Sequence, residues 1–362
     1  MIHQTPSRKS FSAAILDWYG SHARRLPWRS LPGEQPDPYH VWLSEIMLQQ
    51  TTVATVGPYF RKFLESWPSI TDMAEAPLDD ILTAWAGLGY YARARNLHKC
   101  AIAVAREHNG VFPDNMAGLR ALPGIGPYTA AAISAIAFGK AETVVDGNIE
   151  RIISRLYRIR TSLPAAKKEI TEFAAKLTPI EQPGDYAQAL MDIGAGICLP
   201  RNPNCSVCPV SFYCAAFAAG DMENYPVKAP KKIKPTRRAV IFWLQRPDGH
   251  VLMRRRAEKG MLGGMMEFPS TDWADEALET KAAVEHLLQG QPSNLLNDIS
   301  VRKQVRHTFT HFHLELQPVA AQLTSPEKLE LDGAVWIDPD EFGSYALPTL
   351  MTKVVKAVLE SR

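Results

Sequence analysis

The chain has 362 residues, of which 46% are hydrophobic, enough for at least one large core and for about two domains. No run approaches the roughly 18 uncharged apolar residues that a membrane helix needs, so we expect a soluble protein. A formal net charge of +2 is too small to indicate a polyanionic partner by itself, and any nucleic-acid surface must come from local clustering of charge.

Apolar residues recur at three- and four-residue spacing through the first part of the chain, which predicts helices. Proline and glycine separate these segments. We therefore expect an all-α domain over residues 1–226. The predicted helical segments are Phe11–Trp18, Leu43–Met47, Ile81–Trp85, Ala101–Ala105, Met116–Leu122, Ala130–Phe138, Ile149–Leu156 and Ile170–Leu177.

A basic stretch follows. It contains six positive charges, two prolines and no acidic residue. Proline and charge repulsion keep such a segment extended, which predicts an interdomain linker over residues 227–236. The linker is either a solvated tether or one that also touches phosphates. The basic residues are Lys228, Lys231, Lys232, Lys234, Arg237 and Arg238.

Short β-rich runs alternate with helical stretches after the linker, which predicts an α+β domain over residues 237–362. The expected strands are Ala239–Leu244, Val251–Met253, Thr308–Leu316 and Ala334–Ile337, and the expected helices lie near Ala277–Leu288 and Met351–Leu359.

Four of the five cysteines lie in one short stretch, with the spacing C-x6-C-x2-C-x5-C. Thiolates are soft ligands, and four of them close in sequence can surround a metal cofactor. Zinc sites usually pair their ligands as two short C-x2-C knuckles, and only one such pair occurs here, so the spacing favours a 4Fe-4S cluster over zinc. The alternative without a metal is two disulfides, and the lack of a secretory leader disfavours them. The cysteines are Cys198, Cys205, Cys208 and Cys214.

Gly124 and Gly126 stand in a turn, LPGIGPYTA, between two predicted helices. Glycine lets the backbone turn tightly and approach a ligand closely. N-H groups at the entrance of the second helix can then point at a phosphate, which the helix dipole also favours. Gly-x-Gly alone is a weak signal, because any turn between helices can use it.

Two carboxylates have contrasting sequence environments. Glu45 has Val41, Trp42 and Leu48 at helical spacing, and such apolar neighbours would raise its pKa, as a general acid requires. Asp146 follows an apolar run and is placed to cap the next helix, where backbone N-H groups would keep it ionised. Each residue also has a non-catalytic interpretation: Glu45 as a solvent-facing glutamate, and Asp146 as a purely structural helix cap. As a pair, they fit cleavage of a glycosidic bond through a cationic sugar.

These features resemble a known superfamily. Glu45, the LPGIGPYTA turn, Asp146 and the cysteine loop occur in the same order as in the helix-hairpin-helix DNA glycosylases related to endonuclease III. The strings VWLSEIMLQQT from Val41 and GLGYYAR from Gly87 resemble the MutY-type adenine DNA glycosylases specifically. The resemblance implies base-excision repair of adenine mispaired with 8-oxoguanine or guanine in double-stranded DNA, and one 4Fe-4S cluster.

Position 128 separates two branches of the superfamily. The bifunctional glycosylase/lyases carry a lysine there, which forms a Schiff base with the sugar, whereas this chain has Tyr128. A phenol cannot form that imine, so the resemblance implies base removal without obligatory strand cleavage. The nearest rival is a pyrimidine-lesion glycosylase/lyase of the endonuclease III type.

The resemblance also implies residue roles. Glu45 would protonate the flipped adenine at N7, Asp146 would face the cationic sugar, and Tyr128 and Asn148 would orient Asp146. The residues that would fill the space left by the extruded nucleotide are Gln50, Leu88 and Tyr90, of which the last two could instead be ordinary core residues.

From about residue 237 the chain resembles the MutY C-terminal domain, which has a Nudix-like fold. The acids after Phe268 are too scattered for a magnesium-binding Nudix signature, so a nucleotide pyrophosphatase is disfavoured. In the family a Phe-Ser-His loop probes 8-oxoguanine, and this chain has Phe309, Thr310 and His311. A catalytically silent binder of damaged DNA is the remaining alternative. We expect a monomer in a reducing, bacterial-type cytoplasm, without a membrane partner.

Overall fold

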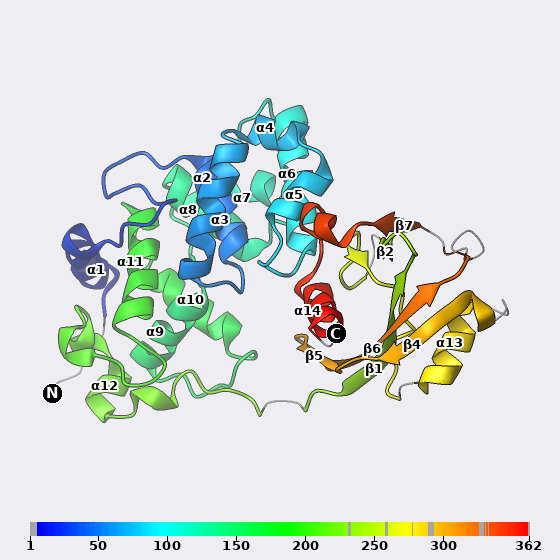
Figure 1. The fold of residues 1–362 in the computed structure, drawn as a ribbon. Helices are drawn as coiled ribbons and strands as arrows, with labels where there is room; N and C mark the ends of the chain where they lie inside the picture. Colours follow the sequence, from blue (N-terminus) through cyan, green and yellow to red (C-terminus); the bar gives the residue numbers. More distant parts are fainter. Residues whose placement is uncertain are drawn as a thin grey trace. The chain divides into compact units, whose positions relative to one another are not determined.

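The computed structural model describes residues 6–230, 233–257, 260–276, 278–288, 293–325, 329, 331 and 333–360. The chain forms two compact units (Figure 1). The first comprises Met1–Glu75 and Asn96–Lys231, and the second Ala76–Arg95 and Lys232–Arg362. Lys231 and Lys232 of the predicted linker lie outside the described residues, and the predicted domain bounds stay a prediction. Within the described ranges, no helix has the length and apolar character to cross a membrane.

The first unit is helical, as predicted. The region between its two segments contributes the short helix α5 (Leu78–Ala84) and the first turn of α6 to the second unit. Short 3-10 turns occupy Cys205–Val207, Ser211–Tyr213 and Met222–Asn224. The helices of the first unit are α1 (Arg8–His22), α2 (Pro38–Leu48), α3 (Val53–Ser66), α4 (Ile70–Glu75), α6 (Ala92–Glu107), α7 (Met116–Ala121), α8 (Pro127–Phe138), α9 (Gly147–Tyr157), α10 (Lys167–Leu177), α11 (Pro183–Gly196) and α12 (Ala215–Ala219).

Helices α8 and α11 lie at the centre of this unit. Helix α8 is apolar on all sides, which is the pattern of a helix buried by neighbours all round, and eight of its residues are buried. Helix α11 packs against α1, α8 and α9, and α2 packs against α8. The site residues on α2, on α8 and at the start of α9 are thereby held on neighbouring rigid elements.

The second unit contains a seven-stranded mixed sheet, counted over the described residues. The strand order is β3-β2-β1-β6-β4, with β5 beside β6 and β7 beside β2. The pair β1 and β6 is parallel, from Thr236 opposite His313 to Gln245 opposite Gln322, and the other pairs are antiparallel. The strands are β1 (Thr236–Gln245), β2 (Val251–Arg255), β3 (Met266–Glu267), β4 (Leu296–Val301), β5 (Val305–Thr308), β6 (His313–Leu323) and β7 (Ala334–Ile337).

The two faces of the sheet are covered by different helices, because successive strand residues point to opposite faces. Ile241 and Trp243 belong to the core that contains Val354 of α14 (Thr349–Leu359). Phe242, between them, belongs to the core that contains Leu287 of α13 (Thr280–Leu288). The α+β domain predicted after the linker is confirmed.

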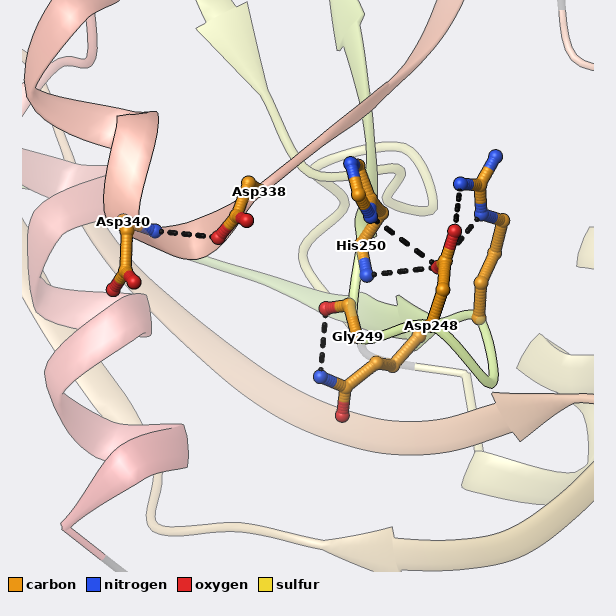
Figure 2. Close-up of polar contacts among 7 residues, drawn as sticks. Asp248, Gly249, His250, Asp338 and Asp340 are labelled. Carbon is orange, nitrogen blue, oxygen red and sulfur yellow. Dashed lines mark hydrogen bonds and ion pairs between the residues drawn. The ribbon is translucent and has the colours of Figure 1, made fainter.

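A tight turn joins β1 to β2 (Figure 2). Gly249 has φ +94°, a conformation that glycine adopts without strain, and the Gln245 side chain donates to its carbonyl oxygen at 2.8 Å. The Asp248 carboxylate accepts from the Arg246 guanidinium and from the His250 main-chain N-H. The Arg246 hydrogen bond lowers the pKa of Asp248 to about 2. These local contacts fix the register of β2 next to β1.

The prediction of one strand over Thr308–Leu316 is wrong. Strand β5 ends at Thr308, β6 begins at His313, and a tight loop reverses the chain between them. The Phe309 main-chain N-H donates to the Phe312 carbonyl at 2.9 Å and closes this loop. Neither glycine nor proline occurs in the loop, so the usual turn signal is missing from the sequence.

Candidate active site

Glu45 lies in the middle of α2, which begins where Asp37 accepts a hydrogen bond from the Tyr39 N-H. Its side chain is buried, with 8% of the residue exposed. Burial raises the pKa of Glu45 to about 7, the Tyr128 hydrogen bond and the Arg29 charge oppose the increase, and the Asp146 charge adds to it. A substantial fraction of this carboxyl therefore stays protonated near neutral pH and can act as an acid.

Asp146 caps α9, as the sequence predicts. Its Oδ1 accepts from the Ile149 main-chain N-H at 2.7 Å, and its Oδ2 accepts from Asn148 Nδ2 at 2.8 Å. Burial nevertheless raises the pKa of Asp146, and the hydrogen bonds from Ile149 and Asn148 only limit that increase. The pKa values of the two carboxyls therefore differ in degree and not in the direction of their change, because both groups are desolvated.

Both carboxyls line one cavity of about 780 Å3. Tyr128, the second residue of α8, lines it too and hydrogen-bonds to Glu45. Burial raises the pKa of Tyr128 well above its usual value, so its hydroxyl stays protonated and donates. The structure thus brings five predicted site residues together, each from the first unit: Glu45, Gln50, Tyr128, Asp146 and Asn148.

A buried ion-pair cluster forms another part of the wall, and sequence reasoning missed it. Asp192 of α11, 3% exposed, pairs with Arg24 Nε at 2.6 Å and with Arg29 Nη1 at 2.7 Å. Both arginines line the cavity. The available signal was an acid, Asp192, among the apolar residues of the last turns of α11, since a buried acid needs a cationic partner.

Asn148 links the site to the cysteine loop. Arg151 donates to Asn148 Oδ1 at 2.9 Å and to the main-chain oxygen of Cys198 at 2.6 Å. Its Nη2 also donates to the Gly194 carbonyl at 2.7 Å. A Cβ atom at Gly194 would lie 2.4 Å from the Cβ of Asn148, so only glycine permits this approach of α11 to α9.

The four predicted cysteine ligands line one small cavity together with Arg155. Arg155 is 1% exposed. It donates to Cys198 Sγ at 3.2 Å and to four main-chain oxygens of the surrounding loops. Four thiols around one space, beside a guanidinium that offsets thiolate charge, fit an iron-sulfur group by donor chemistry. In the described part of the chain, no three His, Cys, Asp or Glu side chains are arranged to hold a single metal ion.

The turn between α7 and α8 has the backbone that a phosphate contact requires. Gly124 has φ +77°, and a Cβ there would lie 2.7 Å from the Cβ of Asn96. Gly126 is the N-cap of α8 and carries no capping side chain. N-H groups at the start of α8 are therefore available to an anion.

The three residues predicted to fill the vacated base stack differ in exposure. Leu88 is 5% exposed and Tyr90 is 50% exposed. Gln50 and Tyr90 have positive φ angles of 60° and 48°. Arg93 donates to the carbonyls of Leu88 and Gly89 and so fixes the loop that carries Leu88 and Tyr90.

The predicted reading loop lies at the tip of the β5-β6 hairpin. Thr310 and His311 are exposed, whereas Phe309 is half-buried and stacks on Trp273 with ring centroids 5.6 Å apart. The Thr310 and Tyr90 hydroxyls hydrogen-bond to each other within the second unit. The aromatic contact anchors the tip and leaves the polar side chains outward.

Three family models match this chain. Residues 43–179 match the HhH-GPD superfamily of base excision DNA repair proteins, residues 198–214 the iron-sulfur binding domain of endonuclease III, and residues 240–357 the NUDIX domain. The first match contains both carboxyls, and the second begins and ends at the outer cysteines. The chain therefore carries an iron-sulfur binding domain.

Relatives and solved structures agree with these matches. A thermostable thymine-DNA glycosylase is 33% identical with a TM-score of 0.52, and covers 59% of this chain and 97% of its own. An endonuclease III-DNA complex, 22% identical with a TM-score of 0.50 over 60% of this chain and 99% of its own, shows the same fold. An adenine DNA glycosylase of Buchnera aphidicola (subspecies Baizongia pistaciae) is 32% identical over 96% of both chains. The human adenine DNA glycosylase is 33% identical, over 96% of this chain and 73% of its own. This chain belongs to the adenine DNA glycosylase family.

Proposed function

We propose that the protein is a monofunctional glycosylase of base excision repair that removes adenine mispaired with 8-oxoguanine or guanine in duplex DNA. One observation carries the proposal: Glu45 and Asp146 line the same cavity, with Tyr128 hydrogen-bonded to Glu45 and Asn148 hydrogen-bonded to Asp146. A cavity of about 780 Å3 is of the size that holds a small organic ligand. It would admit a flipped nucleoside.

The proposed reaction is acid-assisted loss of the base. Protonated Glu45 donates to adenine N7, which makes the base a better leaving group, and Asp146 stabilises the cationic sugar. General acid catalysis typically supplies about 100- to 10,000-fold in rate. The electrostatic contribution of Asp146 and the positioning of the nucleoside supply much of the rest. Water completes the hydrolysis.

Strand cleavage by a Schiff base is not part of the proposal. Tyr128 stands where the lyases of the superfamily carry their lysine. Lys167 also lines the cavity, but its ammonium pairs with Glu150 at 3.5 Å and its side chain is 65% exposed. A lysine nucleophile is usually activated by desolvation, which an exposed side chain lacks. Borohydride trapping on abasic product should therefore give little covalent complex.

The cofactor in this proposal is one 4Fe-4S cluster, held by Cys198, Cys205, Cys208 and Cys214. Arg151 and Arg155 of α9 hold the main chain around these cysteines, and the cluster would link the four thiolates to one another when bound. A visible absorbance band, with about four iron and four sulfide per chain expected for this cluster, tests the assignment against zinc. The cluster also fits the reducing cytoplasm that we propose for the protein.

The second unit in this proposal reads the base opposite adenine. Thr310 supplies the hydroxyl donor of the exposed tip, and Phe309 anchors that tip. We propose that the protein acts as a monomer on duplex DNA, with Gln50, Leu88 and Tyr90 filling the vacated stack.

Single-turnover excision on three duplexes tests the function. Adenine should be removed fastest opposite 8-oxoguanine, more slowly opposite guanine, and negligibly opposite thymine. Glu45→Gln should abolish excision while leaving DNA affinity largely intact. Excision at the wild-type rate by this variant, or equal rates on the three duplexes, would reject the assignment.

A further inference from the structure

A second cavity, of about 410 Å3, opens in the second unit between β1, β2 and the loop that follows β3. Three arginines line it: Arg237 from β1, Arg254 from β2, and Arg256 just after β2. Trp273 and Phe312 form an aromatic wall. The adenine site described above uses none of these residues.

A buried carboxylate holds two of these arginines in place. The Glu267 side chain is 2% exposed and pairs with Arg254 Nε at 2.9 Å and with Arg256 Nη1. Arg256 also lies over the Trp273 ring at 5.2 Å. A single carboxylate therefore orients two guanidinium groups, which leaves one positive charge in excess and fixes both groups before any ligand arrives.

Arg237 on β1 adds a third cation to the lining of the cavity. Its guanidinium lies 4.8 Å from the centre of the Phe312 ring, and among the described residues it takes part in no ion pair. Over the residues that the structure describes, Asp272 is the one acid that lines the cavity. Counting Glu267 and Asp272 against the three arginines, the cavity keeps a net positive charge and is suited to an anion.

We propose that this cavity binds the phosphate group of a nucleotide. Planar guanidinium forks match phosphate oxygens in pairs, which is why arginine recognises phosphate with geometric specificity. Binding is proposed without hydrolysis, because the acids after Phe268 are too scattered for a magnesium-binding Nudix signature. The site binds a phosphate and takes no part in the base removal carried out in the first unit.

The position of the cavity favours a phosphodiester of DNA as the source of that phosphate. Phe312 ends the loop whose tip is Thr310 and His311, and Phe309 of the same loop stacks on Trp273. A phosphate flanks every base, so a strand that contacts the tip has phosphates within reach of the arginines. This choice of source rests on the proposed function of the tip, whereas the phosphate chemistry of the cavity does not. A free nucleotide is the other source.

The salt dependence of DNA binding tests the site. Each phosphate contact contributes about 0.9 to the slope of log affinity against log salt concentration. Arg237→Gln should lower that slope by about 0.9, equally on a matched duplex and on one with adenine opposite 8-oxoguanine. Arg237→Lys should keep most of it. Arg306→Gln is the control, since Arg306 lies on the β5-β6 hairpin that carries the tip, its side chain is 77% exposed, and it does not line the cavity. Circular dichroism confirms that each variant is folded.

A second arm separates the two sources. Inorganic phosphate and deoxyguanosine monophosphate are titrated against the thermal midpoint of the wild type and of Arg237→Gln, because ligands of the native state raise it. An altered salt slope assigns DNA as the source. A rise in midpoint with the nucleotide, lost in Arg237→Gln, with an unaltered slope assigns a free nucleotide.

Unaltered slopes together with equal midpoints, or equal slope changes in Arg237→Gln and Arg306→Gln, would overturn the proposal. Failure of the adenine assignment would appear instead as equal excision on the three duplexes. That failure would not affect the salt-dependence slope measured on the matched duplex.

Discussion

Arg151 donates a side-chain hydrogen bond of 2.9 Å to Asn148 near the start of α9, and each of the two residues also bonds to a group that the other does not contact. Asn148 donates to the Asp146 carboxylate, and Arg151 donates to the main-chain oxygen of Cys198. The cap of α9 and the first cysteine of the loop are therefore positioned by one continuous set of contacts. A disturbance at the cysteine loop has a direct route to the geometry of Asp146.

Arg151→Gln tests this connection. The shorter amide cannot bond to both Asn148 and the Cys198 oxygen, so Asp146 should lose part of its orientation. Loss of such supporting contacts typically costs about 10- to 100-fold in metal affinity or activity. We expect a single-turnover excision rate at least about tenfold lower, with lower iron content per chain. Arg160→Gln, at an exposed position, is the control. A wild-type rate and iron content in Arg151→Gln would contradict the connection.

The pH dependence of excision should follow Glu45. Because the protonated form is the acid, the rate should fall as pH rises through about 7, the pKa to which burial raises Glu45. A pH-rate profile under single-turnover conditions measures this directly. A rate that stays constant from pH 6 to pH 8.5 would be incompatible with Glu45 as the proton donor.

The same raised pKa predicts an effect on stability. The folded-state pKa of Glu45 lies above its ordinary 4.5, so its contribution is fully present below about pH 4.5 and is lost as pH rises through about 7. The Glu45→Gln variant lacks this ionisable group, so it does not lose that stability as pH rises. It should exceed the wild type by about 3 kcal/mol in free energy of unfolding at pH 8, and by little at pH 5. Urea unfolding at the two pH values measures the difference, and equal differences would refute the assignment.

The sequence predicted the elements and residues whose signals are local. Helix periodicity identified α8 and α9, the N-cap position of Asp146 followed from its neighbours, and the cysteine spacing predicted four thiolates around one cofactor. Contacts between residues far apart in sequence left no such signal. The pairing of Asp192 with Arg24 and Arg29 joins positions more than 160 residues apart, and Arg155 meets its acceptors only after the cysteine loop folds over α9. The hairpin tip at Phe309 was missed because aromatic packing, rather than glycine, forms the turn.

Asp192 offsets the positive charge of Arg29, and that charge affects the pKa of Glu45. Arg29 lowers the pKa of Glu45, and its 2.7 Å ion pair with Asp192 offsets that charge. In Asp192→Asn the uncompensated guanidinium should lower the pKa of Glu45, so the pH-rate midpoint should move toward lower pH. Excision at pH 8 should fall about threefold for a displacement of half a pH unit.

Two measurements check the Asp192→Asn result: the thermal stability of that variant, and the pH-rate midpoint of a variant in a second ion pair. Removing one partner of a buried ion pair typically costs about 3–5 kcal/mol, so the thermal midpoint of Asp192→Asn should fall as well. Asp221→Asn breaks the Arg158 pair, which lies outside the adenine cavity, and should leave the pH-rate midpoint in place. A midpoint displaced equally in both variants would show that the effect is general destabilisation.

The two glycines of the turn between α7 and α8 should respond differently to alanine. Gly124 combines φ +77° with a Cβ position 2.7 Å from Asn96 Cβ, whereas Gly126 has no heavy atom within 4 Å of its Cβ position and an ordinary backbone conformation. Gly124→Ala should cost about 1–3 kcal/mol in stability through strain, and should weaken duplex binding because the N-H groups at the start of α8 are displaced. Gly126→Ala should change stability by less than about 1 kcal/mol. Urea unfolding and duplex binding at fixed salt measure both variants, and equal losses in the two would show that the turn does not depend on the Gly124 conformation.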